Sequence, residues 1–374
     1  MTTTSTDRVI DLDVTRAIAL IGVAVMNYHG YLILLGGPVG TSAINHFFDP
    51  WMGPLSTRFA ATFVVIAGMG ISLMTNRGRL TGDRLRRSAD RWTLLRRGFL
   101  LYCFGFFLEW IWNGTILFFY GAYFIVGALL FLLRTRWLVL IGFVAAVAAA
   151  AIQWWALEAA HDTSWLLEGW YTQRPYRSPQ RLLFDTFVNG THPLLPWLAF
   201  VCAGMVIGRY LPLRPSMRRA LAFLGVMMVA GTYLAKSIFA DTPLRERMLA
   251  TDPFSRSLNY TVCALGSALT AFCVIGWIAS ATSTNVVTRS LASAGRTTLT
   301  IYVAHVLVFN ALVTRWHLIK PAGLDVALVF SGVFWLVAVT AAAWWQRRFR
   351  IGPAEWFYRR FGGGIMPAEP TAPR

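Results

Sequence analysis

The sequence predicts an all-α fold, a polytopic bundle of membrane-spanning helices. Of its 374 residues, 56% are hydrophobic and only 14% are charged, whereas about 25% of the residues of a soluble domain are charged. The mean hydropathy is +0.53. A helix of about 20 apolar residues crosses the hydrocarbon core of a bilayer, and runs of this kind recur along the whole chain. No polar block is long enough to form a separate soluble domain.

Apolar runs bounded by charged residues, glycine or proline mark the expected spans. They lie near residues 14–35, 56–75, 96–112, 115–133, 137–157, 194–212, 218–238, 259–280, 295–314 and 324–346. This pattern predicts about ten helices, with a range of nine to eleven. We expect a single transmembrane domain over residues 1–350 and a partly disordered cytoplasmic tail over residues 351–374.

Basic residues set the expected orientation. The net charge is +17, and arginines cluster between apolar runs, with eight in residues 76–97 and four in residues 209–219. Such clusters keep the adjoining loops in the cytoplasm and contact anionic lipid headgroups. We therefore predict a multi-pass protein of the plasma membrane with both termini in the cytoplasm, with membrane lipids and not nucleic acid as partners. The four cysteines lie in apolar runs without metal-ligand spacing, so no metal site is expected.

Polar side chains inside the apolar runs are the first candidate site residues. Asp13 and Arg16 are three residues apart, so they share a helix face and can pair at the inner membrane edge as a structural anchor. Asn27 lies about 16 Å further along the same helix, close to His29. An unpaired polar group in lipid costs several kcal/mol, so these side chains should face the protein interior or a wet cavity. His305, near mid-membrane, needs a hydrogen bond to another helix, and a purely structural role is the alternative there.

The loop after the first span holds another imidazole. His46 stands beside Phe47 and Phe48, followed by Asp49 and Trp51. An imidazole is the side chain best suited to take a proton near neutral pH, and Asp49 could orient the ring. An ordinary surface histidine is the alternative interpretation of His46.

Three stretches of the chain carry short motifs. They are Asp13-Val-Thr-Arg16-Ala-Ile-Ala-Leu with Asn27-Tyr28, His46 and Ala67-Gly68-Met69-Gly70-Ile71-Ser72-Leu73; Ser257-Leu258-Asn259-Tyr260; and Thr298-Leu299-Thr300-Ile301-Tyr302-Val303-Ala304-His305. In this order they resemble the heparan-α-glucosaminide N-acetyltransferase family and its bacterial relatives, in which the second stretch reads Ser-Leu-Ser-Tyr and the third ends Tyr-Val-Gly-His. The likeness touches both ends of the chain, and the middle matches mainly in hydropathy.

The resemblance implies a transmembrane acyltransferase. Its activity would be transfer of an acetyl group from cytoplasmic acetyl-CoA to an amino sugar on the far side of the membrane. The family's catalytic histidine falls on His46 and its asparagine on Asn27, with Tyr260 as a supporting residue. The spacing from Asn27 to His46 is longer than the family pattern and Ala17 replaces a usual glycine, so His29 stays open as the base. The chain also resembles, more distantly, bacterial acyltransferases that O-acylate surface sugars, which typically carry a histidine where Asn27 stands.

In a mechanism consistent with these residues, acyl-CoA binds at the inner membrane face and its acyl group reacts toward the outer face. The phosphates of acyl-CoA would bind arginines near the inner ends of spans; the candidates are Arg96, Arg97, Arg134 and Arg296, for which a role as topology signals is an equal alternative. His46 would act as general base or accept the acyl group transiently, and Asn27 would donate a hydrogen bond to the tetrahedral oxyanion.

The expected acceptor is the amine or hydroxyl of an extracytoplasmic glycan or amino sugar. Aromatic and acidic side chains in residues 158–193, among them Trp165 and Trp170, suit a sugar, although an amphipathic helix in the membrane interface would show the same residues. A transporter or flippase of a small solute or lipid-linked sugar is the alternative function. A homodimer is compatible with the sequence.

Overall fold

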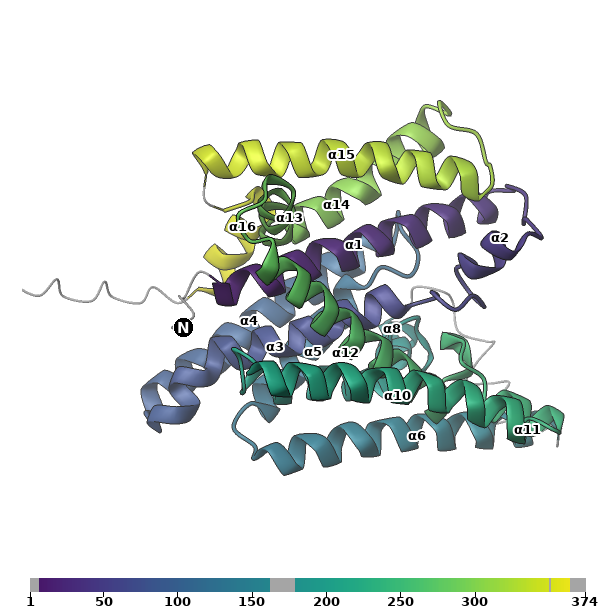
Figure 1. Ribbon diagram of the computed structural model, residues 1–374, viewed down its shortest axis with the longest axis horizontal. Coiled ribbons are helices and arrows are strands. Elements are labelled where there is room, and N and C mark those ends of the chain that lie inside the picture. Colours follow the sequence, from purple (N-terminus) through teal and green to yellow (C-terminus); the bar gives the residue numbers. More distant parts are fainter. Residues whose placement is uncertain (1–6, 162–178, 350, 364–374) are drawn as a thin grey trace, which may run out of the picture.

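The computed structural model describes residues 7–161, 179–349 and 351–363, and every regular element in these ranges is a helix (Figure 1). The α-helices are α1 (Asp7–Leu34), α2 (Ala43–Phe47), α3 (Arg58–Thr81), α4 (Arg84–Leu108), α5 (Leu117–Leu130), α6 (Thr135–His161), α8 (Pro179–Phe184), α9 (Leu194–Gly208), α10 (Pro215–Phe239), α11 (Pro243–Met248), α12 (Leu258–Ala281), α13 (Val286–Arg296), α14 (Thr298–Phe309), α15 (Leu324–Arg348) and α16 (Pro353–Gly362). Short π-helical segments, η1 (Asp185–Asn189) and η3 (Asn310–Arg315), and a 3₁₀ turn, η2 (Pro253–Ser255), complete the described elements.

The all-α polytopic membrane fold is confirmed, but the expected count of about ten spans is not. Seven described helices are long and apolar enough to cross a membrane, and an eighth is gained if the pair 182–189 and 194–208, bent by 63°, counts as one span. Helix α5 has 14 residues, so it extends only about 21 Å. Helix α4 carries arginines through its first half. The hydropathy runs therefore located these helices without showing that each one crosses a bilayer.

The long helices run roughly parallel, and the bundle has two distinct ends (Figure 1). Helices α13 and α16 lie at the end where α1 begins, here called the α16 end, and α2 and α11 lie at the opposite end, the α2 end. The arginine-rich stretch 76–97, expected as a loop, instead forms the last turns of α3 and the first half of α4. Gly82, with φ +74°, makes the turn between them, and Asp83 caps α4 by accepting a hydrogen bond from the Leu85 N–H (2.9 Å).

Helices α3 and α9 approach closely because glycines face each other in their contact. A Cβ atom added at Gly68 would collide with the Val201 carbonyl oxygen, and one added at Gly204 would collide with the Val65 carbonyl oxygen. Small residues of this kind let helix backbones meet in a membrane. This contact sets α3, which carries the third part of the first motif, against the span that follows residue 193.

Helix α16 lies inside the segment 351–374 that the sequence suggested as a partly disordered tail. Its buried Glu355 accepts hydrogen bonds from the N–H groups of Leu299 (2.6 Å) and Thr300 (3.1 Å) and from the Thr300 hydroxyl (2.6 Å). These groups form the N-terminus of α14, where a carboxylate is favoured by the helix dipole. Residues 353–362 are therefore an integral part of the α16 end, and residues 364–374 lie outside the described residues.

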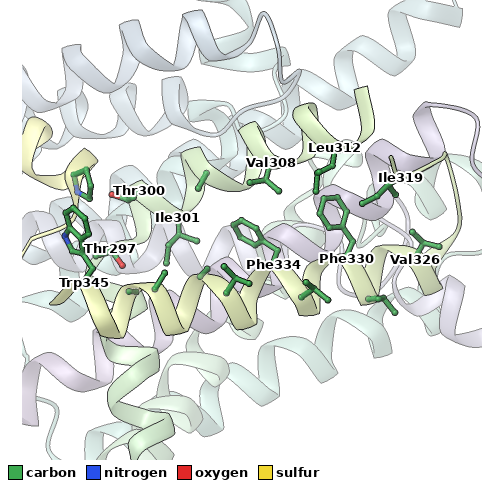
Figure 2. A pocket seen from close by; sticks show the side chains of 18 of the residues that line it. Thr297, Thr300, Ile301, Val308, Leu312, Ile319, Val326, Phe330, Phe334 and Trp345 are labelled. Atoms are coloured by element: carbon green, nitrogen blue, oxygen red, sulfur yellow. The ribbon is translucent and has the colours of Figure 1, made fainter. Parts of the chain in front are cut away.

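A groove of about 830 Å³ runs between α14 and α15 (Figure 2). Ile301 and Val308 of α14 and Leu312 of η3 face Phe330 and Phe334 of α15 across it. Polar lining groups are confined to its two ends. A lining of this kind offers hydrocarbon contact but no set of acid, base and hydrogen-bond donors, so this groove is not a candidate active site.

Candidate active site: two cavities that meet at Tyr302

Two cavities extend into the bundle from opposite ends and reach the same side chain. The α2-end cavity, of about 540 Å³, lies beneath Leu35, Pro50 and Trp51. The α16-end cavity, of about 230 Å³, is bordered by α16. Ile116 and Tyr302 line both cavities. These two residues therefore form part of the wall between the α2-end cavity and the α16-end cavity.

Hydrogen bonds hold this wall in place. The Tyr302 hydroxyl lies 3.0 Å from Thr115 Oγ1 and accepts a hydrogen bond from the Ile116 N–H (3.2 Å). Glu109 in turn accepts hydrogen bonds from the N–H groups of Gly114 (2.8 Å) and Thr115 (3.1 Å). The segment before α5 is thereby fixed against Tyr302 of α14, so the separation of the two cavities depends on defined bonds.

Four arginines line the α16-end cavity: Arg16, Arg97, Arg296 and Arg359. Arg16 Nη1 lies 3.3 Å from Asp13 Oδ1, the pair predicted by their spacing, and Arg296 Nε lies 3.9 Å from Asp13 Oδ2. The only carboxylate in the described lining belongs to Glu355, which already caps α14. The cavity therefore carries an excess of positive charge and suits an anionic ligand.

Arg97 has unused hydrogen-bonding capacity in this cavity. Its Nη1 faces the sulfur of Met74 (3.2 Å), a weak acceptor, and its Nε is buried without a hydrogen-bond partner. Its guanidinium lies 5.1 Å from the ring centroid of Tyr358. Burial raises the pKa of the Tyr358 phenol, so this ring stays neutral beside the cation. A buried guanidinium with free donors is costly unless an anion binds it.

The polar side chains of the α2-end cavity include Asn27, Thr57 and His192. Asn27 Nδ2 lies 3.3 Å from Nε2 of His305, a histidine that is 1% exposed. His305 Nδ1 also contacts the Tyr302 carbonyl oxygen. Because that oxygen only accepts, Nδ1 carries the proton and Nε2 accepts from the Asn27 amide. The buried imidazole thus has a partner on another helix, as expected, and it fixes the orientation of Asn27.

The structure does not bring His46 to Asn27. His46 is exposed on the short helix α2 and does not line either of the two cavities. The Asp49 carboxylate accepts hydrogen bonds from the N–H groups of Trp51 and Met52 (both 2.8 Å), which stabilises a turn. His29 is 2% exposed, and its Nδ1 lies 2.9 Å from the Phe48 carbonyl oxygen, so this histidine connects α1 to the segment after α2.

The other candidates are divided between the cavities and the surface. Arg97 and Arg296 line the α16-end cavity, whereas Arg96 and Arg134 are exposed and do not border it. The Tyr260 hydroxyl lies 2.9 Å from Thr57 Oγ1, so it supports a residue that lines the α2-end cavity. Trp165 and Trp170, considered for sugar binding, lie outside the described residues.

The sequence analysis did not predict three groups of residues that line the two cavities. His192 lies just before the apolar run 194–212, where prolines 193 and 196 already indicate an irregular start of the helix. Tyr302 belongs to a quoted motif, but its position between two cavities depends on long-range packing. Tyr358 and Arg359 lie in the presumed tail, where Pro353 followed by Glu355 is a helix-start signal.

Comparison with protein families gives two matches. Residues 8–235 match heparan-alpha-glucosaminide N-acetyltransferase, catalytic, and residues 211–363 match a protein family of unknown function, DUF418. Comparison with curated proteins gives no match. The first match contains Asn27 and the second contains His305, so the two matched segments meet in one site. Because the first match covers more than half of the chain, this protein belongs to the heparan-α-glucosaminide N-acetyltransferase catalytic family of membrane acetyltransferases.

Proposed function

We propose that this protein transfers an acetyl group from acetyl-CoA, bound at the α16 end, to the amine or hydroxyl of a sugar bound in the α2-end cavity. The observation that carries the proposal is the meeting of the two cavities at Tyr302. One cavity is lined by arginines, and the other holds an oriented asparagine. Such a site allows the two substrates to enter from opposite ends and react at a shared wall.

The α16-end cavity fits the carrier in charge and in size. Phosphate groups bind guanidinium groups strongly, and the Nε–H of Arg97 is a donor without a partner. The cavity volume of about 230 Å³ is below the range typical of small-molecule sites, about 300–1,000 Å³. It therefore suits the narrow thioester arm of acetyl-CoA, with the nucleotide remaining at the mouth near Arg296 and Arg359.

Asn27 is the proposed donor to the oxyanion. When the acceptor attacks the thioester carbonyl, negative charge develops on the carbonyl oxygen, and a fixed donor stabilises it. The Asn27 amide has two N–H groups, of which one is used by His305 Nε2. The second is available to the reaction. His305 acts here as a positioning residue, because it holds the amide and does not line the cavity.

The proposed orientation places the α16 end in the cytoplasm. This end carries the arginines of the α3–α4 junction and of α16, together with those that follow α9. The positive-inside tendency favours the cytoplasm for such an end, and acetyl-CoA is then supplied from that compartment. The sugar acceptor would enter from the opposite side of the membrane.

Release of free CoA tests the proposal. Purified protein in lipid nanodiscs is mixed with acetyl-CoA and glucosamine as an amino-sugar probe, and the liberated thiol is measured. Asn27→Ala should lower kcat by about 100- to 1,000-fold, the usual effect of removing an oxyanion donor. Asn45→Ala, an amide at the α2 end that does not line the α2-end cavity, should leave kcat within about twofold. Absence of acetyl-CoA turnover in the wild-type protein with any amino sugar or hydroxyl acceptor would refute the function.

The variant His46→Ala tests whether the catalytic base lies in the α2-end cavity or on the loop that contains α2. Since His46 is exposed and does not line either cavity, we expect this variant to keep most of its kcat. A loss of kcat comparable to that of Asn27→Ala would instead place the base on the α2 loop, as the family resemblance suggested, and would require that loop to move toward Asn27 during turnover.

A further inference from the structure

The α2-end cavity is lined by an imidazole, that of His192, in addition to the phenols of Tyr31 and Tyr302. Acyl transfer to an amine or hydroxyl needs a base within hydrogen-bond reach of the attacking group. Among the histidines whose side chains the structure describes, His192 lines this cavity, whereas His29, His46, His305 and His317 do not. It therefore shares with Asn27 the space proposed for the acceptor.

Packing fixes the position of His192. Its ring centroid lies 4.6 Å from that of Trp197 and 5.6 Å from that of Phe119, both in edge-on geometry. Its carbonyl oxygen accepts a hydrogen bond from the Tyr123 hydroxyl (2.5 Å). Arg256 donates to the carbonyl oxygens of Asn189 and Gly190 (both 2.8 Å), just before the histidine. A ring held in this way meets the demand of catalysis for a defined geometry.

A hydrogen bond from the neighbouring residue can select the reactive tautomer. His192 Nδ1 lies 2.8 Å from Thr191 Oγ1. When Nδ1–H donates to this hydroxyl, Nε2 keeps its lone pair and can accept a proton. The other imidazole near the wall has no such freedom, because both nitrogens of His305 are engaged, one with the Tyr302 carbonyl oxygen and the other with Asn27.

We propose that His192 is the general base of the acyl transfer, an inference that rests on the proposed function. Nε2 takes the proton of the acceptor amine or hydroxyl as its nitrogen or oxygen forms a bond to the thioester carbonyl carbon. The resulting tetrahedral oxyanion is stabilised by the Asn27 amide. The carbon–sulfur bond then breaks, and the His192 imidazolium returns the proton to the CoA thiolate. The products are the acetylated acceptor and free CoA, and no oxidant, reductant or metal enters the balance.

Chemical rescue tests this role. With acetyl-CoA and glucosamine as probes, His192→Ala should lower kcat about 100-fold, with the KM for acetyl-CoA within about twofold of wild type. Added imidazole should occupy the vacated space and restore part of the lost kcat, and it should not rescue Asn27→Ala. His317→Asn is the matched control, since this histidine is exposed in a turn, and asparagine tolerates its φ of 52°. That variant should be as active as wild type.

Two further variants distinguish the loss of the base from a loss of folding in His192→Ala. His192→Gln keeps a polar side chain of similar reach but cannot take a proton, so its kcat should fall as far as that of His192→Ala. Thr191→Val removes the hydroxyl proposed to accept the hydrogen bond from Nδ1–H, so it should lower kcat severalfold without changing the KM for acetyl-CoA. A His192→Gln variant with the kcat of the wild type would overturn the assignment.

The outcomes separate this inference from the function on which it rests. If the wild-type protein releases no CoA with any acceptor, the proposed function fails. If the wild type is active and His192→Ala matches it, the function stands and the base is another group. If His192→Ala is slow and imidazole gives no recovery, His192 has a structural role only, and the inference is wrong.

Discussion

Gly70 shows how a single residue sets the space of the α16-end cavity. It belongs to the Ala67-Gly68-Met69-Gly70 stretch and lines this cavity, where a Cβ atom would lie 3.8 Å from Arg16 Nη2. One methyl group therefore fits in ordinary contact, whereas a large side chain would displace either the arginine or the ligand. A small residue is therefore required at position 70 to keep this part of the cavity open.

Substitution at Gly70 should act on carrier binding. Gly70→Phe should raise the KM for acetyl-CoA about tenfold or more, since forcing extra volume into a packed site costs about 1–3 kcal/mol. Gly70→Ala is the matched control and should bind acetyl-CoA as the wild type does. Steady-state kinetics with varied acetyl-CoA measure the difference. Equal KM values for the two variants would show that the thioester arm does not enter this cavity.

The residues of the site were predictable to different degrees. Asn27 and His305 were recognised because a polar group within an apolar run must have a partner, although only the packing of α1 against α14 shows that they are each other's partners. Arg97 and Arg96 look equivalent in the sequence, yet one lines a cavity and the other is exposed. Adjacent positions on a helix point about 100° apart, and the tertiary contacts decide which one faces inward.

At the scale of elements, α16 closes the arginine-lined cavity and holds the start of α14. Three hydrogen bonds to Glu355 connect the two helices. Hydropathy gave no indication of this role, because α16 is too short and too polar to count as a span, and its Gly- and Pro-rich surroundings are typical of tails. Contacts with α14, and not the intrinsic helix propensity of its residues, stabilise α16.

Removal of the Glu355 carboxylate should weaken the α16 end. Glu355→Ala leaves N–H groups of α14 without partners, so we expect a loss of about 1–3 kcal/mol and a lower midpoint of thermal unfolding in detergent. Glu355→Gln keeps one acceptor oxygen and should fall between wild type and alanine. Asp241→Asn is the control, because this acid is exposed and exposed ion pairs contribute little. An unchanged midpoint for Glu355→Ala would show that α16 is dispensable for stability.

At the scale of the whole molecule, the proposed orientation predicts which residues reagents can reach. Met52 is exposed at the α2 end and Arg360 is exposed on α16. Met52→Cys should react with a membrane-impermeant maleimide in intact cells, whereas Arg360→Cys should react only after permeabilisation. The wild-type chain, in which three of the four cysteines are buried, supplies the background. The reverse pattern would place the arginine-lined cavity outside the cytoplasm and invalidate the proposed supply of acetyl-CoA.

The wall between the cavities predicts a second property of the whole molecule. Tyr302→Ala would remove the ring that lines both cavities and should join them into a continuous path. Proteoliposomes that contain this variant should conduct small ions, while wild-type protein should remain tight. Tyr302→Phe keeps the ring and loses only the hydroxyl bonds to Thr115 and Ile116, so it should remain closed. A tight Tyr302→Ala variant would mean that other side chains complete the barrier.

The wall at Tyr302 also has an electrical consequence. Where water fills both cavities, the membrane voltage no longer falls evenly across the bilayer and is concentrated over the wall at Tyr302. A unit charge moved across the full voltage gains or loses about 2.3 kcal/mol per 100 mV. In the proposed reaction the acetyl group is neutral and crosses at no electrical cost, while any proton displaced across Tyr302 would experience nearly the whole potential. Under this proposal, the turnover rate in an energised membrane depends on the side of the wall on which the proton is released.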